Sequence, residues 1–323
     1  MINLSIGIPV YNQVTTIRET IESVLSQNVK PYEIVISDNH CNDGTSEIIA
    51  EYKDVIRIIK PPVHLSIAAH WNFCVNQCAG NWVGLISGDD LLYPNYTKAM
   101  INGILKHKDS IFIMGGWNVH NKVNKTLKPH YLLSMGEVTH PPKTTKMLLT
   151  GPKASFAAFC FNKKTFIQVG GYDERYNHNH DWMLQYDFSL TGGVFIKLNE
   201  IIAEYTLDSR PMIEKARIRL YIEDQINYLT NKIWEAKKVG VKSNYIIKCG
   251  GIVFKEFLYF ISKKNIELKS LDISSLKEIA IKLELEDLYD KWLNQDILPT
   301  TNNRTKSFVL KKIRNMYSYF HNI

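Results

Sequence analysis

Residues 82–90 have the sequence Trp-Val-Gly-Leu-Ile-Ser-Gly-Asp-Asp, an apolar run that ends in two adjacent carboxylates, Asp89 and Asp90. A short apolar run bounded by turn formers predicts a buried strand of a parallel sheet. Ligands of open α/β sheets bind at the carboxyl ends of the strands, so this turn is a candidate site. Carboxylates are hard ligands that suit Mg²⁺ or Mn²⁺, especially beside a phosphate. A solvated turn is the alternative, because Gly-Asp-Asp is common turn chemistry.

The residues before this run alternate between strand and helix patterns. We expect strands at residues 4–10, 33–37, 55–59 and 82–85, and helices at residues 16–25, 46–52 and 67–77. This alternation is typical of a parallel sheet covered by helices on both faces. The first strand leads to Asn12, the second to Asp38 and the fourth to Asp89, so these three residues should meet at one sheet edge.

The pattern changes beyond residue 100. We expect strands at residues 111–114, 156–161 and 194–198, a loop-rich covering segment at 122–142, and a helix at 181–190. From about Pro211 the chain is helical and basic. The sequence therefore predicts an α/β domain of residues 1–212 and a helical extension of residues 213–323.

Composition excludes several classes of protein. The net charge of +7, from 39 basic and 32 acidic residues, is modest and argues against a dedicated nucleic-acid binder. The five cysteines lack paired metal spacing and are expected to be reduced, as in the cytosol. The start leads directly into a strand, so we expect no signal peptide. Residues 245–261 are too short and too charged to span a bilayer.

Several ordered segments resemble the inverting nucleotide-sugar glycosyltransferases of family 2, which have the GT-A fold. They are residues 5–12, 33–45, 70–72 with 79–83, and Gly-Gly-Tyr-Asp-Glu at 170–174, followed by His180 and Asp181. The similarity runs from about residue 3 to residue 210. It implies a doubly wound, mostly parallel sheet, with a nucleotide-sugar-binding half at residues 1–100 and an acceptor half at residues 101–212.

The resemblance also implies roles for particular residues. Asp38 would recognise the nucleobase, Asp89 would hold the metal ion, and Asp181 would be the catalytic base. Contacts to the nucleotide are expected from Pro9, Tyr11, Asn12, Asp38, Asn39, Asn72 and Gly88.

Three positions depart from the family pattern. Ser87 stands where the family has the first acid of Asp-x-Asp, so Asp89 would carry the metal alone or with Asp90. His180 replaces a glutamate. Asp208 lies where many relatives have a metal-binding histidine and is a substitute oxygen ligand. The expected cofactor is Mg²⁺ or Mn²⁺.

The residues have chemical reasons for these roles. A carboxylate at Asp38 accepts a hydrogen bond from the imide N–H of uracil or thymine, which favours a UDP- or dTDP-linked donor. Tyr11 either packs on the base or belongs to the core, and Asn39 is expected to shape the turn. A divalent ion stabilises the departing diphosphate. Asp181 deprotonates the acceptor hydroxyl, with inversion, or is instead an ordinary helix N-cap.

Residues near Asp181 are candidates for contact with the acceptor, namely His178, His180 and Trp182. Metal binding by the two histidines is disfavoured because no third ligand is evident. The expected acceptor is a glycan or polyprenyl-linked oligosaccharide, in O-antigen, capsule or lipooligosaccharide synthesis.

The final segment, residues 304–314, carries five basic residues and no acid. With the helical apolar spacing of the residues around it, it suits an anionic membrane surface, and a helix packed on the catalytic domain is the alternative. We therefore expect a cytoplasmic protein, peripheral at the inner face of the plasma membrane.

Other functions are weighed against transfer. A sugar-phosphate nucleotidyltransferase would have a Gly-rich basic loop after the first strand, and residues 12–15 are not one. A non-catalytic sugar-nucleotide or carbohydrate-binding protein would not need Asp89 and Asp181 together. A processive synthase is disfavoured because membrane spans and a Gln-x-x-Arg-Trp motif are missing.

Overall fold

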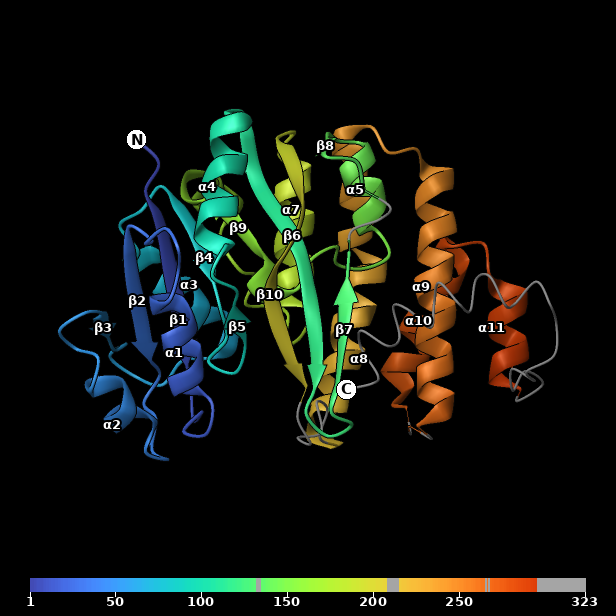
Figure 1. Cartoon of the computed structure of the whole chain (residues 1–323). Helices are drawn as coiled ribbons and strands as arrows, with labels where there is room; N and C mark the ends of the chain where they lie inside the picture. Colours follow the sequence, from blue (N-terminus) through green and yellow to red (C-terminus); the bar gives the residue numbers. More distant parts are fainter. Residues whose placement is uncertain (132–134, 208–214, 265, 267, 295–323) are drawn as a thin grey trace. The chain divides into compact units, whose positions relative to one another are not determined.

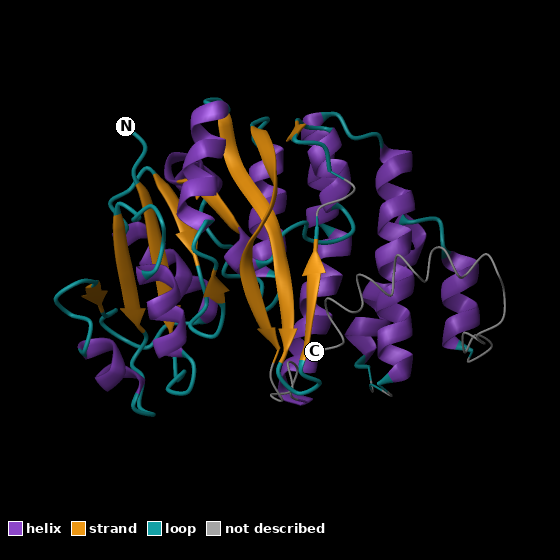
Figure 2. Ribbon diagram, in the orientation of Figure 1, coloured by secondary structure: helices purple, strands orange, loops and turns teal. Residues whose placement is uncertain are grey.

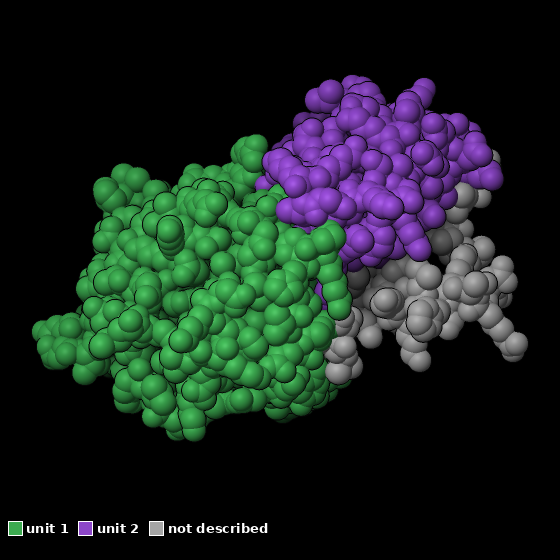
Figure 3. All heavy atoms as spheres, turned by 90° about the horizontal axis from the view of Figure 1, so that it is seen from above, with its two compact units in different colours: residues 1–144, 152–209 green, residues 145–151, 210–323 purple. Residues whose placement is uncertain are grey.

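The computed structural model describes residues 1–131, 135–207, 215–264, 266 and 268–294. The chain divides into two compact units (Figure 3), residues 1–144 with 152–209 (unit 1) and residues 145–151 with 210–323 (unit 2). The predicted functional division at residue 212 stays a prediction. The compact units differ from it in that residues 145–151 and 210–212 belong to unit 2.

Unit 1 contains a sheet of ten strands in its described part, in the order β3-β2-β1-β4-β9-β6-β10-β5, with β7 beside β6 and β8 beside β10. The first half is parallel and follows the predicted alternation (Figure 1). Its strands are β1 (Leu4–Val10), β2 (Glu33–Asp38), β3 (Arg57–Ile59) and β4 (Trp82–Leu85). The helices between them are α1 (Ile17–Leu25), α2 (Thr45–Ala50) and α3 (Ile67–Gln77).

The second half of the sheet is mixed. Strand β9 (Phe159–Asn162) is antiparallel to both β4 and β6 (Ser110–Asn121), so β6 runs in the same direction as β4. Strand β10 (Val194–Leu207) is parallel to β6, and β5 (Leu91–Leu92) is antiparallel to β10. The mostly parallel, doubly wound architecture is therefore confirmed.

Helices follow or separate these strands in the chain (Figure 2). They are α4 (Tyr96–Lys106), α5 (Lys143–Leu148), α6 (Lys163–Val169) and α7 (His180–Leu190). Local chemistry fixes their ends, as α6 illustrates. The Asn162 side chain accepts a hydrogen bond from the Thr165 amide at its start, and Gly170 at φ 90° ends it.

Several sequence predictions differ from the structure in extent. The segment at 122–142 is not only loop, because β7 (Thr126–His130) pairs with β6 and β8 (Val138–Thr139) pairs with β10. Strand β7 is largely exposed and therefore polar, which hid it from an apolar-pattern search. The expected strand at 156–161 begins as a 3₁₀ turn, η1 (Phe156–Ala158).

Close packing joins the two halves of the sheet. All seven residues of β1 are buried, because helices cover both faces. Gly84 on β4 has no room for a side chain, since a Cβ there would collide with the Tyr96 hydroxyl, which donates to the Phe159 carbonyl at 2.8 Å. Phe112 stacks on Phe195 with ring centroids 4.9 Å apart.

Unit 2 is helical in its described part. It contains α8 (Lys215–Thr230), the 3₁₀ segment η2 (Lys232–Val239), α9 (Ser243–Lys263), α10 (Ser270–Lys282) and α11 (Glu286–Leu293). Arg219 on α8 pairs with the buried Asp272 of α10, which fixes these helices together. Among the described residues, no helix is both long and apolar enough to cross a membrane. The predicted basic segment 304–314 lies outside the described residues.

Candidate active site

The carboxyl ends of β1, β2 and β4 meet at one edge of the sheet, as predicted. The Asn39 amide donates to the Val10 carbonyl at 2.9 Å, and the Ile86 amide donates to the Gly7 carbonyl at 3.0 Å. The loop after β1 then joins the other two ends. The Gln13 amide donates to Thr45 Oγ1 at 2.8 Å, and Thr16 Oγ1 donates to the Gly88 carbonyl at 2.8 Å.

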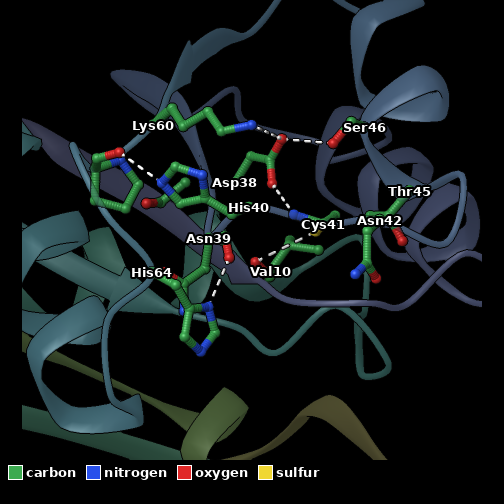
Figure 4. A network of polar contacts seen from close by, with 12 residues as sticks. Val10, Asp38, Asn39, His40, Cys41, Asn42, Thr45, Ser46, Lys60 and His64 are labelled. Atoms are coloured by element: carbon green, nitrogen blue, oxygen red, sulfur yellow. Dashed lines mark hydrogen bonds and ion pairs between the residues drawn. The ribbon is translucent and has the colours of Figure 1, made fainter.

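Asp38 is held rigidly at the end of β2 (Figure 4). It is only 6% exposed. Its Oδ1 accepts from the Cys41 amide at 2.8 Å, its Oδ2 accepts from Ser46 Oγ at 2.6 Å, and Lys60 Nζ lies 3.7 Å away. Burial alone would raise the pKa of Asp38, but these hydrogen bonds and the Lys60 charge bring that pKa below its ordinary value. The site therefore holds a buried carboxylate anion.

The neighbours of Asp38 divide into a turn and an aromatic surface. Asn39 is buried. Its side-chain Nδ2 donates to the Leu65 carbonyl, and its Oδ1 accepts from the Leu65 backbone amide, both at 2.9 Å. This supports the expectation that Asn39 shapes the turn. His64 Nδ1 lies 3.0 Å from the Asn39 carbonyl oxygen. The centroids of the His64 and Tyr11 rings are 4.6 Å apart. Tyr11 is 48% exposed, so the core alternative for Tyr11 is wrong.

The other residues that are expected to contact the nucleotide are themselves held by contacts with the rest of the protein. Pro9 is buried inside β1, and a side chain at Gly88 would displace the end of the Gln13 side chain. Asn12 adopts φ 51°, and its Oδ1 accepts from the Asn42 amide at 3.0 Å. Asn72 Nδ2 donates to the Tyr172 carbonyl at 2.9 Å, and its Oδ1 accepts from the Tyr172 amide at 2.8 Å. Direct nucleotide contact by these residues stays a prediction.

The two adjacent acids after β4 have different environments. Asp89 is partly exposed and accepts a 2.5 Å hydrogen bond from Ser87 Oγ. Asp90 is 1% exposed, and its Oδ1 accepts from the Thr206 amide of β10 at 2.9 Å. Burial, followed by the charges of Asp89 and Glu204, raises the pKa of Asp90 well above its ordinary value. Asp90 is thus an interior acid rather than an open ligand.

Among the described residues of the predicted metal set, Asp89 is partly exposed and Asp90 is buried, and Asp208 lies outside the described part of the chain. Metal binding by these residues stays a prediction. No three His, Cys, Asp or Glu side chains among the described residues gather into a group that could hold a metal ion. One accessible carboxylate still fits Mg²⁺-type binding, in which one or two carboxylates act together with substrate phosphates. The donor set fits an ion shared with a diphosphate.

A polar network around the buried Glu204 was missed from sequence. Glu204 on β10 accepts from the Tyr93 hydroxyl at 2.9 Å and lies 2.7 Å from His120 Nδ1. Asn118 Nδ2 donates to the same Tyr93 hydroxyl at 2.6 Å. The available signal was a single acid within the apolar run Ile-Ile-Ala-Glu-Tyr at 201–205.

Asp181 lies in the first turn of α7 and is not its N-cap. That position belongs to Asn179, at φ 58°, so the N-cap alternative is wrong. Asp181 Oδ1 accepts from the Trp182 amide at 2.8 Å. Burial raises the pKa of Asp181 to about 6, against the effect of the Trp182 amide. A carboxyl with this pKa is suited to act as a base near neutral pH.

The three candidate acceptor residues differ in accessibility. Trp182 is 4% exposed and His180 is 6% exposed, so both belong to the interior around α7. His178 has intermediate exposure. Of the three, His178 alone keeps appreciable solvent exposure, and acceptor contact stays a prediction.

Residues 70–72 on α3 connect the Asp38 strand to the Asp181 helix. His70 Nε2 lies 2.8 Å from Ser37 Oγ, next to Asp38. Trp71 contacts the His180 ring with centroids 5.5 Å apart, next to Asp181, and Asn72 holds Tyr172. Burial, followed by the Asp181 charge, raises the pKa of Tyr172, so that charge acts on Tyr172. Consecutive side chains of α3 thus contact residues that are adjacent to both acids.

Comparison with known proteins agrees with this architecture. Residues 5–162 match the model of the family described as Glycosyl transferase family 2. EpsE of Bacillus subtilis strain 168 is 32% identical over 109 residues, which are 32% of this chain and 39% of EpsE. The Escherichia coli UDP-Glc:alpha-D-GlcNAc-diphosphoundecaprenol beta-1,3-glucosyltransferase WfgD is 27% identical over 119 residues, 36% of this chain and 47% of WfgD. These alignments span about half the relatives' lengths or less.

The crystal structure of S. aureus TarS 1–349 in complex with UDP-GlcNAc matches with a TM-score of 0.70. The match covers 91% of this chain and 88% of that chain, at 15% identity. Residues 5–162 therefore belong to glycosyl transferase family 2. The chain has the GT-A fold.

Proposed function

We propose that the chain is an inverting glycosyltransferase. It moves a sugar from a UDP- or dTDP-linked donor to a hydroxyl of a glycan or lipid-linked oligosaccharide. Surface-polysaccharide synthesis, of the O-antigen, capsule or lipooligosaccharide type, is the proposed setting. The similarity to WfgD, a UDP-Glc:alpha-D-GlcNAc-diphosphoundecaprenol beta-1,3-glucosyltransferase, supports this choice of donor and acceptor class.

The single observation that carries the proposal is that short chains of contacts join the residues next to the three acids. His70 lies against Ser37, which precedes Asp38, and Trp71 contacts His180, which precedes Asp181. Gln13 connects the turn after β2 to the turn after β4, which carries Asp89. Its backbone amide donates to Thr45 Oγ1, and its side-chain Nε2 lies 3.5 Å from Ser87 Oγ. Recognition, charge stabilisation and proton removal can then act on one substrate.

Asp38 recognises the base in this proposal. Each carboxylate oxygen has a second lone pair beyond the hydrogen bonds from Cys41 and Ser46. A lone pair can accept the imide N–H of uracil or thymine, whereas cytosine has no such donor. The exposed ring of Tyr11, supported by His64, offers the base a surface for stacking.

Asp89 would hold Mg²⁺ or Mn²⁺ together with the diphosphate of the donor. The ion supplies positive charge that stabilises the leaving diphosphate. The chain's own contribution is to orient the Asp89 carboxylate, which the Ser87 hydroxyl fixes by its hydrogen bond. Asp90 supports the turn from inside through the Thr206 amide.

Asp181 removes the proton from the acceptor hydroxyl. The acceptor oxygen forms a bond to the anomeric carbon on the face opposite the diphosphate, and the bond between that carbon and the diphosphate oxygen breaks. The proton stays on the Asp181 carboxyl, and the diphosphate leaves with the electron pair. One displacement inverts the configuration at the anomeric carbon.

The test is turnover by the full chain. Purified protein with Mn²⁺ is incubated with a panel of UDP- and dTDP-sugars and lipid-linked oligosaccharides, and nucleotide release and the anomeric configuration of the product are measured. We expect acceptor-dependent release and an inverted product, both lost in Asp181→Asn and retained in the surface control Asp54→Asn. Donor binding without acceptor-dependent release across the panel would favour the non-catalytic alternative. A retained configuration would refute the single displacement.

A further inference from the structure

Helix α9, labelled in Figure 1, carries a stripe of exposed lysines and tyrosines along one face. The stripe consists of residues three or four apart, which lie on one face of a helix. They are Tyr245, Lys248, Ile252, Lys255, Tyr259 and Lys263. The three lysines and both tyrosines are exposed, and Ile252 has intermediate exposure. The stripe extends for about 27 Å at 1.5 Å per residue.

The opposite face of α9 is fixed inside unit 2. Phe254, Phe257 and Ile261 are buried, and Tyr221 of α8 packs on Phe260 with ring centroids 4.9 Å apart. The outward stripe is therefore held in place by the core of the unit. It can meet a flat partner without any rearrangement of the helix.

Lysine and aromatic side chains are paired along this surface. Lys263 Nζ lies 6.0 Å from the centroid of the Tyr259 ring, and Lys146 Nζ lies 5.2 Å from that of Tyr245. Tyrosine prefers the boundary between water and lipid, and a lysine stem can lie along apolar surface while its charge reaches a headgroup. This chemistry suits a membrane surface.

Charge decides between a membrane and a second copy of the chain. The only acid on α9 is Glu256, and burial raises the pKa of its carboxyl to about 7, so near neutral pH it offsets the lysines only in part. Two copies meeting through this stripe would oppose lysine to lysine. An anionic surface is attracted instead.

We propose that the α9 stripe docks the protein on a membrane surface that contains anionic phospholipids, with the helix lying parallel to that surface. The lysines contact phosphate headgroups, and the two tyrosines enter the interface. This inference goes beyond the proposed transfer reaction and does not depend on it, because vesicle binding is measured without donor or acceptor.

The test is co-sedimentation of the full chain with vesicles of phosphatidylcholine alone, or of phosphatidylcholine mixed with phosphatidylglycerol. We expect binding to the mixed vesicles only, weakened by salt. The triple variant Lys248→Gln, Lys255→Gln, Lys263→Gln should lower the partition coefficient on the order of 100-fold, from the usual contribution of each lysine. The control is a triple variant of exposed lysines in unit 1 with the same charge change, Lys53→Gln, Lys98→Gln, Lys164→Gln. This control variant should bind the mixed vesicles like wild type.

Two further arms separate the stripe from other sources of binding. Tyr245→Ala with Tyr259→Ala should weaken vesicle binding while keeping its salt dependence. The inference is overturned if the α9 triple variant binds like wild type. It is also overturned if only neutralising the basic residues of segment 304–314 abolishes binding, or if the chain binds soluble polyphosphate but no vesicles.

Discussion

Asp181→Asn should stabilise the protein at neutral pH while it abolishes transfer. Burial raises the pKa of Asp181 from its ordinary value of 3.8 to about 6. The folded state therefore binds this proton more tightly than the unfolded chain does. The stability contributed by the proton is fully present below pH 3.8 and is lost as the pH rises through about 6.

The size of the effect follows from this difference in pKa. A separation of about two pH units corresponds to about 3 kcal/mol of unfolding free energy, at 1.36 kcal/mol for each unit. An asparagine has nearly the same shape and no charge to bury. The free-energy difference between Asp181→Asn and wild type should therefore grow by about 3 kcal/mol between acidic pH and pH 8.

Urea unfolding of both proteins across this pH range measures the difference, and Asp54→Asn on the surface should change stability by less than about 0.5 kcal/mol. The same ionisation should appear in catalysis. Wild-type kcat/KM should rise with pH to a plateau, with an apparent pKa near 6, since only the ionised carboxyl accepts a proton. A pH-independent stability difference would refute the desolvated position of Asp181, and donor affinity lost in Asp181→Asn would refute its role as base.

Three other changes test the remaining acids. Asp38→Asn should weaken UDP binding by about 1.5–3 kcal/mol, the range for a charge-assisted hydrogen bond, and calorimetry should show less discrimination between UDP and CDP; unchanged discrimination would remove Asp38 from base recognition. Asp89→Ala should weaken Mn²⁺-dependent donor binding, and unchanged Mn²⁺ dependence would place the metal elsewhere. Asp90→Ala should instead lower unfolding free energy by about 1–3 kcal/mol, because the Thr206 amide loses its acceptor, with Mn²⁺ dependence retained; a loss of that dependence alone would return Asp90 to the metal site.

The parallel half of the sheet could be predicted from sequence because its signals are local. Buried parallel strands are continuous apolar runs, and the helices between them have helical spacing. Once β1, β2 and β4 are placed, the common edge of Asn12, Asp38 and Asp89 follows from the handedness of the crossovers. The mixed half was harder to predict from sequence. Strand β9 forms by pairing with β4 and β6, which are distant in the sequence, and β7 is largely exposed and has no apolar pattern of its own.

The orientation of individual side chains depended on distant partners. Asp89 and Asp90 are adjacent in sequence, yet the Thr206 amide, more than a hundred residues away, keeps Asp90 inside. The side-chain amide of Asn72, which is predicted to contact the nucleotide, forms two hydrogen bonds with the backbone of Tyr172, a hundred residues further on. Hydrogen bonds between such distant residues cannot be predicted from the hydrophobic periodicity of a single segment.

The most direct test of the central claim is a crystal structure of the full chain with Mn²⁺ and UDP. The account predicts the uracil imide within hydrogen-bond distance of the Asp38 carboxylate, the diphosphate and metal ion beside Asp89, and the Asp181 carboxyl facing the position of the sugar. UDP bound at another sheet edge, or Asp181 on the far side of α7 from the diphosphate, would contradict it.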